Sequence, residues 1–228
     1  MSTRRIIRAF KWYCKGLFPF PIFEIVLVTV LLGQYLAIKN MGTEVFVSVS
    51  SFLALPLYGV TIGLHFLRDG RTTIFELSLV KSPVAVFLGR CLALIVGMVP
   101  IAIGDYLLLH FFDAQSLFTP LLVLLLTYIA FTMCSSLLQD SKIAMVVLFS
   151  WEFLMPMASS VVFATAGHYG RIDPVMSGFL YLVAPLYSSS YAVLLDLPQV
   201  TGLMLASFVS LALVTTALVL FRRMEFQF

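Results

Sequence analysis

The sequence predicts an all-α integral membrane protein with six transmembrane helices, and three observations lead to this fold class. Of the 228 residues, 61% are hydrophobic and 11% are charged, whereas soluble domains carry about 25% charged residues. The mean hydropathy is +1.05. A soluble protein of this length could not bury so much apolar surface, so lipid must surround most of the chain.

The third observation is the number of apolar segments. A bilayer core requires about 20 apolar residues per helix, and six segments meet this requirement. We treat residues 1–228 as a single transmembrane domain. The predicted spans are residues 20–38, 45–67, 86–109, 119–138, 143–165 and 201–221.

The segment before the first span, residues 3–18, alternates basic and apolar residues at roughly helical spacing. This pattern predicts an amphipathic helix lying in the membrane interface. The alternative is a charged tail that only sets the topology. In the predicted helix Ile6, Ile7, Phe10 and Leu17 face lipid, while Arg4, Arg8, Lys11 and Lys15 face phosphate and water.

Between the second and third spans, the stretch from Arg68 to Arg90 interrupts the apolar pattern with four basic and two acidic residues. A polar loop between two hydrophobic spans is a place where a soluble partner can bind a membrane subunit. The positive-inside rule assigns this loop to the cytoplasm. With that orientation twelve of the fourteen basic residues fall on the cytoplasmic side, both termini are cytoplasmic, and only Lys39 and Arg171 lie outside.

The longest external piece, about residues 166–200, is apolar and aromatic and is broken by three prolines. We expect it to dip into the outer leaflet as short helices packed on the spans, in the manner of a re-entrant hairpin. No internal repeat relating the first three spans to the last three was identified, which argues against a secondary transporter.

The sequence contains few signs of catalysis. No Walker phosphate loop, H-E-x-x-H or G-x-S-x-G motif occurs, so the chain does not bind ATP in the Walker manner and we expect no catalytic residue. Three separated histidines and three cysteines without C-x-x-C spacing predict no metal site. Nothing indicates a nucleic-acid partner.

Carboxyl groups within spans are the candidates for a polar pathway, because charge inside a bilayer is costly. Glu152 lies deepest, and it either faces a pathway or partner or is a protonated structural group. Glu24 and Asp105 lie nearer span ends, where we expect them to reach the interface. Ser48 and Ser51 either line a polar path or bond back to their own helix.

Gly59 and Gly63 form a G-x-x-x-G step in the second span. Small residues at this spacing let two helix backbones approach closely, so the step predicts tight helix packing.

The loop after the second span resembles the first cytoplasmic loop of type-2 ATP-binding-cassette exporter permeases. That family has an acidic-basic step, then G-T-x-E-x-L-L-S-x-P, and L-G-K leading into the third span. Val80 stands where the family usually has proline, Pro83 follows Ser82, and Arg90 replaces the lysine. The matching residues are Arg68-Asp69-Gly70, Thr72-Thr73, Glu76-Leu77-Ser78-Leu79, Ser82 and Leu88-Gly89-Arg90.

The resemblance extends to the six spans, the basic N-terminal helix and the apolar hairpin before the last span. In that hairpin Ala184-Pro185-Leu186-Tyr187 is similar to the family's N-P-[LF]-x-[YH] step. The resemblance implies that Pro185 and Tyr187 belong to an outer gate.

The resemblance further implies that the cytoplasmic loop holds a coupling helix seated on a separate ATPase. Two such ATPases would bind ATP and Mg²⁺, so this chain would need no cofactor of its own, and a second permease copy or homologue would complete the path. The predicted contacts to the ATPase are Arg68, Asp69, Arg71, Thr72, Thr73, Glu76, Ser78, Lys81 and Ser82.

The sequence thus favours the membrane subunit of an exporter in the cell membrane. An ion- or proton-coupled carrier using Glu152 is the main alternative, followed by an intramembrane enzyme acting on lipid and a scaffold without transport. An aromatic, weakly charged path favours a lipid-like, peptide or hydrophobic substrate over a bare ion.

Overall fold

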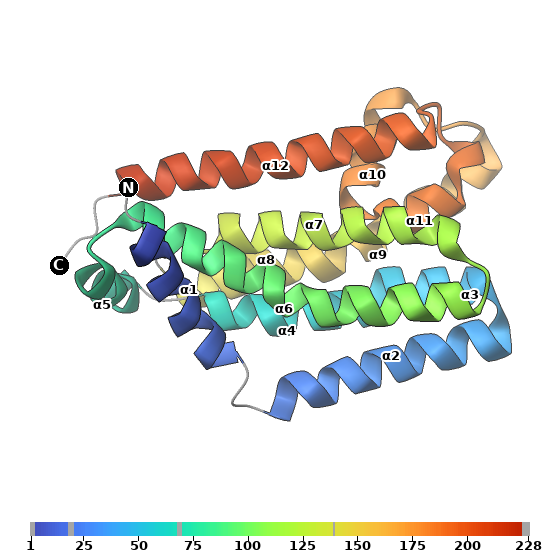
Figure 1. Ribbon diagram of the computed structural model, residues 1–228. Helices are drawn as coiled ribbons and strands as arrows, with labels where there is room; N and C mark the ends of the chain where they lie inside the picture. Colours follow the sequence, from blue (N-terminus) through green and yellow to red (C-terminus); the bar gives the residue numbers. More distant parts are fainter. Residues whose placement is uncertain (1–2, 18–20, 68–69, 139, 225–228) are drawn as a thin grey trace.

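The computed structural model describes residues 3–17, 21–67, 70–138 and 140–224, and this part is almost entirely helical (Figure 1). Within it, the β pairing is limited to one bridge between Ile172 and Leu195. The helices are α1 (Thr3–Leu17), α2 (Pro21–Met41), α3 (Thr43–Val49), η1 (Ser50–Ala54), α4 (Leu55–Phe66), α5 (Gly70–Val80), α6 (Pro83–Phe111), η2 (Gln115–Leu117), α7 (Phe118–Ser135), α8 (Ser141–Phe149), η3 (Ser150–Leu154), α9 (Met155–Tyr169), α10 (Pro174–Val183), α11 (Pro185–Ser190), η4 (Ala192–Leu194) and α12 (Gln199–Arg223).

Six continuous helical segments in the described residues are long and apolar enough to cross a membrane, which confirms the predicted all-α, multi-pass class. Each overlaps one predicted span. They are Pro21–Met41, Thr43–Phe66, Pro83–Phe111, Gln115–Ser135, Ser141–Ala166 and Gln199–Arg223.

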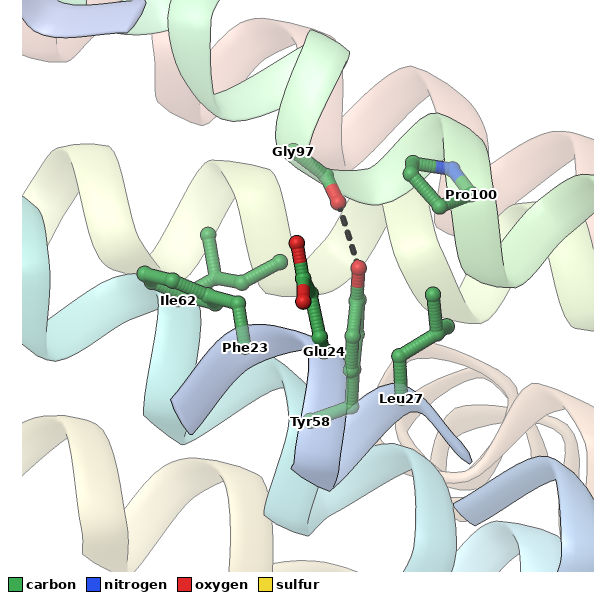
Figure 2. A pocket seen from close by; sticks show the side chains of 7 residues that line it. All are labelled: Phe23, Glu24, Leu27, Tyr58, Ile62, Gly97 and Pro100. Carbon is green, nitrogen blue, oxygen red and sulfur yellow. Dashed lines mark hydrogen bonds between the residues drawn. The ribbon is translucent and has the colours of Figure 1, made fainter. Parts of the chain in front are cut away.

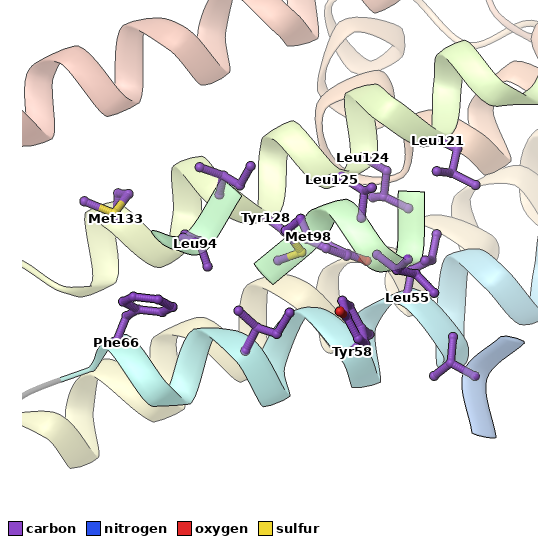
Figure 3. Packing of buried hydrophobic residues seen from close by; sticks show 14 of the residues in the cluster. Leu55, Tyr58, Phe66, Leu94, Met98, Leu121, Leu124, Leu125, Tyr128 and Met133 are labelled. Atoms are coloured by element: carbon purple, nitrogen blue, oxygen red, sulfur yellow. The ribbon is translucent and has the colours of Figure 1, made fainter. Parts of the chain in front are cut away.

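The core of the bundle lies between α4, α6 and α7. In Figure 3, Leu55 and Phe66 of α4 face Leu94 and Met98 of α6, with Leu124 of α7 packed beside them. In an apolar 18-residue stretch of the span that contains α7, 61% of the residues are buried, against 22% in the corresponding stretches of α2 and α12. The two outer helices flank the bundle (Figure 1) and expose apolar side chains, which suits contact with lipid.

The second and fifth spans each contain one wide π turn. In η1 the carbonyl of Ser50 accepts from the N–H of Leu55, and in η3 the carbonyl of Ser150 accepts from the N–H of Met155. In both spans a proline lies two residues after the end of the turn, at Pro56 and Pro156. Proline lacks an N–H and its ring clashes with the carbonyl four residues earlier, so a wider turn relieves both problems.

The two π turns share a sequence pattern, S-S-F-L-A-L-P in one span and S-W-E-F-L-M-P in the other. Each turn packs against the opposite span, η1 against α9 and η3 against α4. This local correspondence between the two halves covers only seven residues, which is too short to be recognised in the sequence as an internal repeat.

The N-terminal helix α1 packs along the first turns of α6 rather than lying apart from the bundle. Ala9 and Tyr13 are buried, and a Cβ on Gly89 of α6 would come within 2.6 Å of Ala9 Cβ. Ile7 is exposed, but Phe10 packs against the core, so the predicted apolar face is partly used for docking. The four basic side chains predicted to face water are exposed: Arg4, Arg8, Lys11 and Lys15.

The apolar segment between α9 and α12 forms a helical hairpin from α10 and α11. The Asp173 carboxylate caps α10 by accepting from the N–H groups of Val175 and Met176. The Ser188 hydroxyl donates to the Leu180 carbonyl at 2.9 Å and joins the two helices. The hairpin lies at the end of the bundle opposite α5 (Figure 1).

Candidate functional site

The loop between the second and third spans is occupied by the helix α5. It lies at the end of the bundle where α1 crosses α6 and α12 ends (Figure 1). The predicted contact residues Arg68 and Asp69 lie outside the described residues. Arg71 belongs to α5, but its side chain also lies outside the described part.

Two faces of α5 differ in burial. Thr73 and Glu76 are 4% and 1% exposed and point into the protein, and Leu77 and Val80 pack against the core. These four positions recur at helical spacing and form one face, which we call the inner face of α5.

The opposite face of α5 is exposed. Phe75 and Leu79 are 58% and 53% exposed, and Thr72, one turn before Phe75, is exposed on the same side. The Ser78 hydroxyl bonds back to the Phe75 carbonyl at 2.7 Å. We call Thr72, Phe75 and Leu79 the outer face of α5.

Arg90 holds the inner face of α5 in place. Its Nη2 contacts the Glu76 carboxylate and donates to Thr73 Oγ1 at 3.2 Å. Its Nε donates to the Tyr13 hydroxyl at 3.0 Å, and that hydroxyl donates to Glu76 Oε2 at 2.5 Å. The guanidinium also lies 5.7 Å from the ring centroid of Phe221. One buried cluster therefore joins α1, α5, α6 and α12.

The burial of Tyr13 changes its acidity. Loss of solvent raises the pKa of the Tyr13 hydroxyl, the Arg90 charge opposes this, and the Glu76 charge and hydrogen bond add to it. The phenol therefore stays protonated and can donate to Glu76 throughout the neutral range.

The position of Arg90 corrects the prediction that it belongs to a cytoplasmic loop. The helix α6 already begins at Pro83, where the Ser82 hydroxyl caps it by accepting from the N–H of Ala85. Arg90 is 0% exposed. Its charge is tolerated there because Glu76 lies against it, and Tyr13 and Thr73 accept hydrogen bonds from its Nε and Nη2.

The same cluster changes the expected roles of Thr73 and Glu76. Both were predicted to contact an ATPase, but in this structure they face the protein interior and have no surface to offer a partner. Phe75 and Leu79, which the sequence analysis did not select, are exposed instead. Their spacing from Thr72 was the signal that could have identified them.

α5 ends at Val80, and the backbone of the next residue, Lys81, adopts φ 54°. The Arg5 side chain donates to the Lys81 carbonyl at 3.2 Å, so α1 also contacts this turn. Lys81 is exposed and Ser82 is partly buried as the cap of α6. Of the predicted contact residues whose side chains are described, Thr72, Ser78 and Lys81 are the exposed ones.

Glu152 lies in the π turn η3 and is 0% exposed. Thr132 of α7 donates to its Oε1 at 3.5 Å, which is a long hydrogen bond, and its Oε2 has no hydrogen-bond partner. No basic side chain in the described part of the chain forms an ion pair with it. The carboxyl group is thus enclosed between α4, α7 and η3.

The two glycines of the second span allow this close packing. A Cβ on Gly59 would lie 2.6 Å from Glu152 Oε2 and 2.8 Å from the Tyr128 ring. A Cβ on Gly63 would lie 2.7 Å from a methyl group of Leu148. The G-x-x-x-G step therefore packs α4 against α7 and the fifth span within one chain.

The two predicted path serines differ. The Ser48 hydroxyl bonds back to the Glu44 carbonyl at 3.1 Å, which was one of the two expectations for it. Ser51 is 1% exposed and its hydroxyl has no hydrogen-bond partner. No hydrogen bond between described residues joins either serine to Glu152.

Asp105 corrects a further prediction. It was expected to reach the interface, but it is 0% exposed within α6, where it faces α2 and α4. Glu24 is exposed and lines a small cavity of about 120 Å³ between α2, α4 and α6 (Figure 2). The Tyr58 hydroxyl donates to the Gly97 carbonyl at 2.7 Å across this cavity.

Pro185 and Tyr187, the predicted gate residues, lie in the hairpin. Pro185 is buried at the start of α11. The Tyr187 ring lies 4.6 Å from Phe52 of η1 and 5.3 Å from Phe163 of α9, measured between centroids. Burial, together with a hydrogen bond and charge from Tyr191, raises the pKa of Tyr187 to about 12. Tyr187 thus connects the hairpin to both spans that contain a π turn.

Among the described residues, no group of three or more His, Cys, Asp or Glu side chains is placed to hold a metal ion. The candidate sites are therefore the α5 cluster at one end of the bundle and the buried carboxyl groups within it. Comparison of the chain with protein-family models, with curated proteins and with solved structures found no match.

Proposed function

We propose that this chain is the membrane permease subunit of an ATP-driven exporter and that α5 is its coupling helix. In this proposal the protein lies in the cell membrane with both termini and α5 in the cytoplasm. Two separate cytoplasmic ATPase subunits bind ATP and Mg²⁺, and a second permease copy or homologue completes the path. The exported substrate is a lipid-like molecule, a peptide or another hydrophobic compound.

One observation carries the proposal: α5 is fixed to the spans on one face and exposed on the other. Glu76 and Thr73 on the inner face bind Arg90 of α6. Phe75 and Leu79 on the outer face are more than half exposed at the end of a bundle whose α1 carries exposed basic residues. An exposed apolar pair on an otherwise anchored helix suits a protein partner.

The proposed mechanism follows from this anchoring. Movement of the ATPases on ATP binding displaces the outer face of α5. Because Arg90 joins α5 to α1, α6 and α12, the displacement reaches the spans as a rigid-body shift rather than as bending of a loose loop. The partner must bind two arrangements of α5 with different affinities for this coupling to operate.

The experiment that tests the proposal is purification of the tagged chain from its native host, followed by measurement of ATP hydrolysis in the purified complex. A Phe75→Glu/Leu79→Glu variant should lose the ATPase, because two charges enter an apolar contact. Val193→Glu is the control, since Val193 is 84% exposed in η4, which directly follows α11 of the hairpin at the opposite end of the bundle. This control should retain the ATPase in full.

Two results would refute the proposal. The first is a wild-type chain that purifies without any nucleotide-hydrolysing subunit. The second is a Phe75→Glu/Leu79→Glu variant that retains the ATPase and its turnover at wild-type levels while remaining folded.

A second candidate function is an ion- or proton-coupled carrier that uses Glu152. The observation that favours it is a fully buried carboxyl group with one oxygen unpartnered, placed on a π turn in the middle of a span. The isolated chain should then move solute in liposomes under a proton gradient. Glu152→Gln should abolish this transport, whereas Glu44→Gln, an exposed change in α3, should not.

A further inference from the structure

Three polar side chains from three different elements meet inside the bundle, away from Glu152. Gln34 of α2, Ser50 of η1 and Asp105 of α6 are each 0% exposed. Gln34 Nε2 donates to Ser50 Oγ at 3.0 Å. The Gln34 amide also lies beside the Asp105 carboxyl group, on which its second N–H acts as a donor.

The hydrogen-bond inventory of this group is incomplete in a specific way. Gln34 Oε1, which can only accept, has no partner, and neither oxygen of Asp105 has one. The second N–H of Gln34 can serve one oxygen of an ionised Asp105, but the other oxygen and Gln34 Oε1 would both remain acceptors without a donor. A protonated Asp105 supplies one O–H donor, which the free Gln34 Oε1 can accept.

The charge balance leads to the same conclusion. In the described part of the chain no basic side chain forms an ion pair with Asp105. From α4, Tyr58 lies within electrostatic reach of Asp105, but its hydroxyl already donates to the Gly97 carbonyl. From α2 and η1 the facing groups are the uncharged Gln34 and Ser50. An uncompensated carboxylate buried in such surroundings gives up its charge by binding a proton.

We propose that Asp105 is an intramembrane proton-binding site, in which the carboxylic acid donates its proton to Gln34 Oε1 and Gln34 in turn donates to Ser50. Release of the proton leaves a carboxylate facing an amide oxygen, so the Gln34 amide must rotate or separate from Asp105. Because Ser50 begins the π turn of the second span, protonation of Asp105 is linked to the position of that turn.

The cavity in Figure 2 is lined by Tyr58 but not by Asp105, so exchange through it would run by way of Tyr58. It reaches from Glu24, near the start of α2, to Tyr58, and its volume of about 120 Å³ has room for several water molecules. Tyr58 also lies within electrostatic reach of Asp105, so it connects the cavity to the acid. This inference does not depend on the proposed exporter function.

The test is infrared spectroscopy of the full chain in lipid nanodiscs at pH 7, with aspartate labelled by ¹³C at its side-chain carboxyl. Among the aspartates that the structure describes, Asp105 alone is buried, while Asp113, Asp140, Asp173 and Asp196 are exposed. A model aspartate is almost completely ionised at pH 7. We therefore expect one protonated, ¹³C-shifted carboxyl band per chain.

Variants assign the band. Asp105→Asn should remove it, and Asp113→Asn, the matched change at an exposed site of the same region, should leave it intact. Gln34→Leu should move it to higher frequency because the acid loses its acceptor. Ser50→Ala should shift it as well, by freeing the Gln34 amide. The two last variants keep the carboxyl group and so test the proposal even where Asp105→Asn does not fold.

The proposal would be overturned by a wild-type spectrum without a protonated aspartate band at pH 7. It would equally be overturned by a band that persists in folded Asp105→Asn or is unmoved in both Gln34→Leu and Ser50→Ala. An ionised Asp105 whose carboxylate bands respond to added Na⁺ would instead identify a metal cation as the ligand.

Discussion

The guanidinium of Arg90 and the carboxylate of Glu76 are in direct contact inside the protein, with the two side chains 0% and 1% exposed. The contact connects a long span to the short helix α5 that precedes it. Because both charges are removed from solvent, each depends on the other, and this dependence can be measured.

Removal of one partner of this pair should be costly. Glu76→Gln or Arg90→Gln leaves an uncompensated buried charge, and we expect a loss of about 3–5 kcal/mol in unfolding free energy. Denaturant unfolding in a mild detergent measures it. The control is Arg171→Gln, which breaks the exposed contact to Asp196, 3.8 Å long with Arg171 74% exposed, and should change stability by under about 1 kcal/mol. Equal effects of the two changes would contradict this account.

Tyr13 should contribute to the same cluster through its hydroxyl alone. Tyr13→Phe keeps the ring but removes the donor to Glu76 and the acceptor for Arg90. Hydrogen bonds to charged groups are worth about 1.5–3 kcal/mol, so a loss of that size is expected. Trp12→Phe, a change at a neighbouring side chain that is 44% exposed, is the control and should be nearly neutral. An unaltered Tyr13→Phe protein would show that ring packing is sufficient.

Gly59 should not tolerate a side chain. The Cβ of alanine would lie 2.6 Å from Glu152 Oε2 and 2.8 Å from the Tyr128 ring, so Gly59→Ala should destabilise by about 1–3 kcal/mol. Gly33→Ala in α2 meets nothing within 4 Å and should be neutral or slightly stabilising. Combining Gly59→Ala with Glu152→Ala should cost less than the sum of the single changes. Strict additivity would mean that the contact is absent.

Tyr187 should make the hairpin sensitive to alkali. Its folded-state pKa of about 12 lies above the ordinary tyrosine value of 10.0. A raised pKa gives stability that is complete below pH 10, since both states then hold the proton, and that is lost as the pH rises towards 12. The fall in melting temperature between pH 10 and 12 should therefore be smaller in Tyr187→Phe than in the wild type. Identical pH profiles would exclude this contribution.

Hydropathy was sufficient to predict the six helices, because a bilayer imposes the same length and apolar composition on every span. It could not predict what polar residues do once the spans pack. Arg90 looked like part of a loop because its partners Tyr13 and Glu76 lie 77 and 14 residues away in sequence. Such contacts depend on the packing of α1 and α5 and leave no local pattern.

Asp105 and Gln34 illustrate the same limit. A carboxyl group near the end of an apolar segment can reach the interface or turn inward, and only the neighbouring helices decide which. Gln34, a polar residue in the first span, was a signal that the sequence analysis did not use. The outer face of α5 was within reach of sequence reasoning, since Thr72, Phe75 and Leu79 repeat at helical spacing.

The π turns at Ser50 and Ser150 have a consequence for how these spans face their surroundings. A π turn adds one residue to the helical repeat, so the side chains before and after it follow two registers offset by about 100°. A single helical wheel drawn through either span would therefore assign the residues after the π turn to the wrong face. Deleting one residue within either turn should restore a continuous register and rotate the following segment, moving Gly59 in one span, or Ser159 in the other, off its packing face.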